Sequence, residues 1–174
     1  MRPALSLLDG LNRLVSWTVG LLFALATAAV LTQVMVRFAL PRMGIVVSAP
    51  WTEECARYLV AWSVFHGVAV LCRDARLIAV EMLAFMLPRR IGQTVKLIGV
   101  VISMGFFAIL LATGIEWTGM SSIEASPVMR IPMSWIYASM PVGSALALLN
   151  LAAFLIESLT GRRDPIGEAA LAVD

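Results

Sequence analysis

Long runs without any Asp, Glu, Lys or Arg side chain alternate with short polar segments along this 174-residue chain. At about 1.5 Å of rise per helical residue, three of these runs are long enough to cross a hydrocarbon core of roughly 30 Å. The shorter run, from Tyr58, spans only if the charged residues just before it lie at the headgroup level or against another protein. The pattern predicts an all-α integral membrane protein with four transmembrane helices. The charge-free runs are Leu14 to Val36, Tyr58 to Cys72, Leu97 to Ile115 and Ile131 to Ile156.

Helix-breaking residues and polar segments set the expected boundaries within one membrane domain, residues 1–174. A further apolar stretch, 75–87, is too short to span and is flanked by arginines, so we expect a short interfacial helix on the cytoplasmic side. The polar tail, 161–174, is expected to be frayed, and the loop before the last span to be exposed and irregular. The expected transmembrane helices cover about 14–38, 50–72, 92–117 and 132–157.

Lys and Arg are spread unevenly over the segments between these helices. With the N-terminus inside, nine of them fall on the cytoplasmic side, and four, Arg37, Arg42, Arg57 and Arg130, fall on the other. The positive-inside rule therefore predicts that both termini are cytoplasmic. The first apolar run is too long for the core of a signal peptide, so we expect the first helix to be retained.

Composition narrows the class of protein further. With 60% hydrophobic and 14% charged residues, the chain has too few polar side chains to coat a soluble globule, and its net charge of +2 does not suggest nucleic acid as a partner. Cys55 and Cys72 lie at opposite ends of one expected helix, about 25 Å apart by helical rise, so they cannot form a disulfide with each other.

Residues suited to catalysis are scarce. The sequence has one histidine and no zinc-protease, nucleophile-elbow, Cys-x-x-Cys or phosphate-loop motif, so we expect neither an enzyme nor a cofactor. His66 falls inside the second expected helix. It could relay protons, or it could pack as a neutral imidazole bonded to a neighbouring helix.

Charged residues gather at the start of the second expected helix. Glu54 and Arg57 are three residues apart on one helical face and are expected to pair, whereas Glu53 points about 100° away. The pair could be an ordinary headgroup-level ion pair or a pair that docks another subunit.

The fourth expected helix contains Pro141, which leaves the carbonyl of Tyr137 without its usual donor and should kink the helix. The kink could mark a transport gate or simply serve packing. Ser139, Gly143 and Ala147 recur every fourth residue and would let another helix approach closely. Ala24 and Ala28 give the first helix a weaker version of this surface.

Two stretches resemble the small membrane subunit of tripartite ATP-independent periplasmic (TRAP) transporters, the DctQ-like four-helix subunit. The first is Trp51-Thr52-Glu53-Glu54-Cys55-Ala56-Arg57-Tyr58, followed by Trp62, Gly67 and Arg73. The second runs from Ile131 to Gly143 and contains Pro132, Trp135, Tyr137 and Pro141. One departure lies after the second helix, where the family often has a histidine and an aspartate; here Leu77 and Glu81 stand in their places.

The resemblance implies a non-catalytic small permease subunit in the bacterial inner membrane. It would scaffold the large many-helix permease subunit of a sodium-coupled secondary transporter for organic acids, to which a soluble periplasmic substrate-binding protein delivers the substrate. Partners would be these two proteins and the lipid bilayer. The competing interpretation is a stand-alone four-helix exporter that works as a dimer with His66 as its coupling residue. Residues expected at the subunit or binding-protein interface are Trp51, Glu53, Glu54, Arg57, Trp62, Arg73, Pro132, Trp135, Tyr137, Pro141 and Gly143.

Overall fold

The computed structural model describes residues 2–75 and 86–161, and its long elements are all helices. Four of them are long and apolar enough to cross a membrane, which confirms the predicted fold class. The expected interfacial helix and polar tail fall almost wholly outside the described residues, and the orientation of the bundle stays a prediction. The helices are α1 (Arg2–Val34), α2 (Trp51–Leu71), α4 (Arg89–Met120), the single turn α5 (Ser134–Tyr137) and α6 (Ser139–Leu159).

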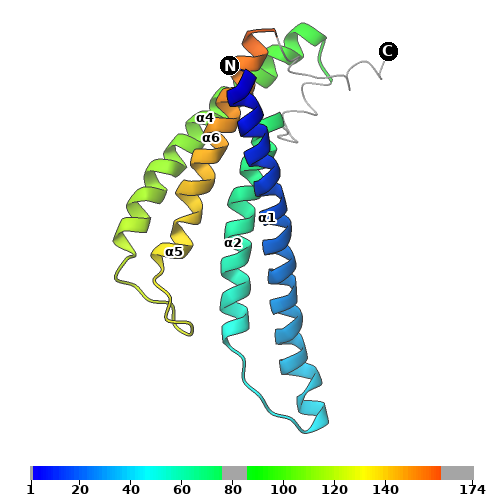
Figure 1. Cartoon of the computed structure of the whole chain (residues 1–174), viewed down its shortest axis with the longest axis vertical. Helices are drawn as coiled ribbons and strands as arrows, with labels where there is room; N and C mark the ends of the chain where they lie inside the picture. The colour runs from blue at the N-terminus through cyan, green and yellow to red at the C-terminus, as the bar shows by residue number, and fades with distance from the viewer. Residues whose placement is uncertain (1, 76–85, 162–174) are drawn as a thin grey trace.

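The helices pack in the spatial order α1, α2, α6, α4, so α6 and α2 occupy the middle (Figure 1). In the most apolar part of the Ser134–Leu159 span, 56% of the residues are buried, whereas the corresponding value for the Leu5–Met43 span is 6%. α6 is therefore the central helix. The N-terminus and the last turn of α6 lie at one end of the bundle, here named the terminal end. The other end, named the loop end, carries the α1–α2 connection and the segment between α4 and α5.

The apolar core sits toward the terminal end. It joins the last residues of α2, the first half of α4 and the second half of α6, and it includes the fully or nearly fully buried side chains Ala69, Val100, Leu151 and Phe154. Most other large apolar side chains of the spans are exposed, as expected where a helix faces lipid rather than protein.

α1 is longer at both ends than the charge-free run indicates. It begins at Arg2 rather than near Leu14, because Asp9 and Asn12 are tolerated inside the helix through bonds to other helices, described below. At its other end it continues through a π-helical turn, Met35–Ala39, and a 3₁₀ turn, Pro41–Met43. The extended helix carries the α1–α2 connection farther from the terminal end than the α4–α5 segment (Figure 1).

The last span is divided near its proline. Ala138 separates α5 from α6, and Pro141 lies in the first turn of α6, where its missing N–H costs the helix least. The Pro141 ring also packs against α4: a Cβ added at Gly114 would come within 2.8 Å of the proline Cδ. The break therefore coincides with a close α4–α6 contact, which favours packing as the role of Pro141.

The segment between α4 and α5 is more ordered than the sequence indicates. Ala125 and Pro132 form an antiparallel bridge, and Ser126 donates its N–H to the carbonyl of Ile131 at 2.8 Å. Ser126 is almost fully buried. Most of the loop is exposed, as expected, but it is less irregular than expected, because backbone bonds close part of it into a short hairpin that packs against α2. We name residues 121–133 the outer hairpin.

Candidate functional site

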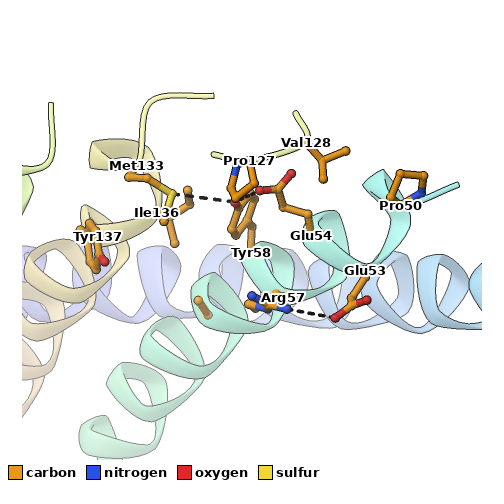
Figure 2. A pocket seen from close by; sticks show the side chains of 11 residues that line it. Pro50, Glu53, Glu54, Arg57, Tyr58, Pro127, Val128, Met133, Ile136 and Tyr137 are labelled. Atoms are coloured by element: carbon orange, nitrogen blue, oxygen red, sulfur yellow. Dashed lines mark hydrogen bonds and ion pairs between the residues drawn. The ribbon is translucent and has the colours of Figure 1, made fainter. Parts of the chain in front are cut away.

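A cavity of about 470 Å³ lies at the loop end, between the first turns of α2, the outer hairpin and α5 (Figure 2). Its walls combine three ionisable side chains at the start of α2 with apolar and aromatic side chains from all three elements. The charged start of α2, which the sequence analysis singled out, thus forms one wall of this cavity. The lining residues are Pro50, Glu53, Glu54, Arg57, Tyr58, Ala61, Pro127, Val128, Met133, Ile136 and Tyr137.

Glu54 is the buried acid of this cavity, with only 7% of the residue exposed. Its Oε2 accepts the backbone N–H of Met129 at 2.7 Å, and its Oε1 accepts the Tyr58 hydroxyl at 2.5 Å (Figure 2 shows the side chains of Glu54 and Tyr58). The first bond ties α2 to the outer hairpin. The carboxylate also lies in the first turn of α2, where the partial positive charge of the helix end favours it.

The expected pairing of Glu54 with Arg57 was wrong. Arg57 instead donates to Glu53 at 3.1 Å, one helical turn earlier, and the side chains of this pair are 70% and 61% exposed. Both spacings fit an α-helix, and the choice follows from Tyr58 and the outer hairpin, which occupy both oxygens of Glu54. Glu53 also accepts the side-chain amide of Gln33 at 3.2 Å, which joins α1 to α2.

Aromatic side chains surround this end of the bundle. The Trp62 indole donates to the carbonyl of Trp135 at 3.2 Å, and the rings of Trp117 and Tyr137 lie 5.9 Å apart. Trp51, Trp117 and Trp135 are each half exposed or more. Of the remaining expected interface residues here, Pro132 is exposed within the outer hairpin and forms its bridge.

Arg73 is not part of the cavity; it lies at the terminal end, one residue after Cys72 in the 3₁₀ turn that follows α2. Its Nη1 and Nη2 donate to the two carboxylate oxygens of Glu157 on α6 at 2.7 and 2.9 Å, and its Nε donates to Asp9 on α1 at 2.8 Å. One nearly buried guanidinium therefore joins three helices. The sequence singled out Arg73 but neither of its partners.

A pair of asparagines forms a second polar junction near Arg73. Asn12 and Asn150 donate to each other's side-chain oxygens at 2.7 Å, and Asn150 also donates to the carbonyl of Ala69. Asn150 is fully buried. An asparagine within an apolar run was the available signal, since such amides usually bond across helices.

Lys96, expected at the cytoplasmic surface, is also buried, and its ammonium lies 5.7 Å from the centre of the Phe154 ring.

Gly143 marks the closest approach of α6 to α2. A Cβ added there would lie 2.7 Å from the Phe65 Cβ and 2.8 Å from its carbonyl oxygen. Ser139, Gly143 and Ala147 are all buried, which confirms that this stripe admits another helix. The weaker stripe is not covered by the helices of this chain, since Ala24 and Ala28 are exposed, and its role stays a prediction.

His66 contacts its own helix rather than a neighbouring one. Its Nδ1 lies 2.9 Å from the carbonyl of Trp62, and the two rings stack with their centres 5.2 Å apart. The imidazole is therefore held by the preceding turn of α2, and the expected bond to a neighbouring helix was wrong.

The fold and these sites define a small multi-pass α-helical protein of the membrane, with charged and amide junctions at one end and an aromatic-rimmed cavity at the other. The chain belongs to the DctQ component family of tripartite ATP-independent periplasmic transporters, whose model matches residues 26–161. It is similar to the C4-dicarboxylate TRAP transporter small permease protein DctQ of Pseudomonas aeruginosa, with 26% identity over 129 residues. The match covers 71% of this chain and 61% of that protein, so the chain spans about three-fifths of the length of this curated relative.

Family membership confirms the resemblance drawn from the two motif stretches. The protein is a transporter component rather than an enzyme, and a multi-pass protein of the bacterial inner membrane.

Proposed function

We propose that this chain is the non-catalytic small permease subunit that braces the large permease subunit of a sodium-coupled, binding-protein-dependent secondary transporter for organic acids. The family match over residues 26–161 carries the proposal, because it covers the end of α1 and all of α2, α4 and α6. The substrate class follows the name of the Pseudomonas aeruginosa relative, a C4-dicarboxylate transporter protein.

The distribution of acids supports a bracing role. The acids within the four candidate spans all lie near a span end, whereas a protein that moves ions itself needs ionisable groups deep within its spans. These acids are Asp9, Glu53, Glu54, Asp74, Glu116 and Glu157. The buried Glu54 is bonded within the chain to Tyr58 and Met129, and the partly buried Glu157 is bonded to Arg73. The contact of His66 with its own helix supports packing over proton coupling.

The candidate interface residues divide by exposure. Trp51, Glu53, Arg57 and Trp135 are at least half exposed and are available to the large subunit or to the binding protein. Contacts made by the charged pair should weaken with salt, because exposed charges are screened. In contrast, Arg73, Pro141 and Gly143 lie within the bundle and act by fixing its shape.

Reconstitution in proteoliposomes tests this proposal. We expect no uptake of a C4-dicarboxylate by the purified chain alone, and uptake when the large permease subunit, the binding protein and an inward sodium gradient are all supplied. Liposomes with the large subunit and binding protein but without this chain are the control. Saturable, gradient-driven uptake by the chain alone would contradict the proposal and restore the small-exporter interpretation.

A further inference from the structure

We propose that the loop-end cavity binds the headgroup of a zwitterionic aminophospholipid, with its ammonium group against the exposed Glu53 and its phosphate against Arg57. Glu54, which is bonded to Tyr58 and Met129, adds a second negative charge to the lining. Glu53, Glu54 and Arg57 line one cavity of about 470 Å³ and lie within two turns of α2 (Figure 2). The inference concerns the chain on its own and does not depend on the proposed transport function.

The level of the cavity in the membrane favours a lipid over a soluble ligand. Three of the five tryptophans, Trp51, Trp117 and Trp135, belong to the loop-end portions of the helices, and Tyr58 and Tyr137 line the cavity itself. Such amphipathic rings concentrate at the headgroup level of a bilayer, where one side of the ring is wet and the other apolar. The cavity therefore opens where phospholipid headgroups lie.

The charges of the cavity select among headgroups. Two carboxylates and one guanidinium give its lining a formal sum of −1, which disfavours an anionic phospholipid and suits a headgroup that carries its own cation. A primary ammonium offers three N–H donors, whereas a quaternary ammonium offers none. Arg57 is exposed and its Nη2 donates to Glu53 at 3.1 Å, so the other N–H groups of its guanidinium can reach a phosphate.

An apolar path leads from the cavity toward the bilayer core. Ala61 and Val64 follow Arg57 at four and seven residues, so the three lie on one face of α2. Ala61 lines the cavity and Val64 is about half exposed. An acyl chain can run along this face while the headgroup stays beside the charged residues.

Native mass spectrometry of the delipidated chain tests the assignment, by titration with phosphatidylethanolamine, phosphatidylcholine and phosphatidylglycerol of identical acyl chains. We expect phosphatidylethanolamine to bind about ten-fold more tightly than the other two, the ratio that about one charge-assisted hydrogen bond provides. Soluble phosphoethanolamine should compete weakly, because it lacks the acyl chains. Equal binding of all three lipids would overturn the proposal.

Variants separate the two halves of the headgroup. Glu53→Gln should remove the preference for the ethanolamine headgroup, and Arg57→Gln should weaken all three phospholipids. Glu124→Gln, a matched change at an exposed outer-hairpin acid outside the cavity lining, should change nothing. Because Glu53 and Arg57 are exposed, neither change should prevent folding. An unchanged preference in Glu53→Gln, or unchanged affinities in Arg57→Gln, would contradict the proposal, as would a photo-crosslinker at Val128 that captures a partner protein while no phospholipid binds.

Discussion

Removing the guanidinium of Arg73 should destabilise the bundle more than removing any charge at the loop end. The side chains of Arg73 and Glu157 are only 11% and 13% exposed, and they share two charge-assisted hydrogen bonds. Breaking a buried pair by deleting one partner typically costs about 3 to 5 kcal/mol, because the remaining charge stays desolvated. Asp9 is 57% exposed, so its bond should add less than about 1 kcal/mol. We expect Arg73→Ala to lower the free energy of unfolding by about 3 to 4 kcal/mol.

The measurement is reversible unfolding in mixed micelles, with the fraction of denaturing detergent as the variable. Arg57→Ala is the matched control: it deletes the same side chain from a pair that is more than 60% exposed, and should cost less than about 1 kcal/mol. The double variant Arg73→Ala with Glu157→Ala should be more stable than Arg73→Ala alone, since it removes the carboxylate that lost its two bonds to Arg73. A loss for Arg73→Ala no larger than that for Arg57→Ala would refute the reasoning.

Two further outcomes follow from helix contacts and charge distribution. Gly143→Ala places a methyl group against backbone atoms of α2 and should destabilise the bundle by about 1 to 3 kcal/mol, whereas Gly105→Ala, with nothing within 4 Å, should be neutral or stabilising in the same unfolding assay. Single cysteines at Ser122 and Thr160, in a background without the two native cysteines, should react with an impermeant thiol reagent from opposite sides of the membrane. Labelling of both positions from outside intact cells would contradict the four-span orientation.

The four spans were predictable because the bilayer imposes a simple rule, in which about 20 residues without charge form one crossing. The tight α2–α6 contact was predictable for a related reason, since Ser139, Gly143 and Ala147 share one helical face. The same reasoning did not locate a contact within the chain at Ala24 and Ala28. α1 packs mainly on α2, so most of its circumference is left uncovered by this chain, and a small-residue pattern alone does not say which neighbour a face meets.

The polar partners were the part that sequence reasoning missed. Glu157 lies 84 residues from Arg73, and Asn150 lies 138 residues from Asn12, so only the tertiary arrangement brings them together. The wrong pairing of Glu54 with Arg57 concerned two residues close in sequence, but it also arose from a partner on a distant segment. Helical spacing allows a bond to Arg57, but the backbone of Met129 in the outer hairpin competes for the carboxylate, and no periodicity within α2 reveals it.

The unequal ends of the bundle bear on the choice between a brace and a stand-alone exporter. Alternating access requires helices to separate at each end in turn. At the terminal end, separating α2 from α6 would break the Arg73–Glu157 pair, at about 3 to 5 kcal/mol, and the bonds of Asn150, at roughly 0.6 kcal/mol each by membrane averages. Without a compensating partner, an opening that costs 4 kcal/mol is populated about once in a thousand molecules. The terminal end should therefore behave as a closed, rigid unit, which suits a subunit that holds a partner in place.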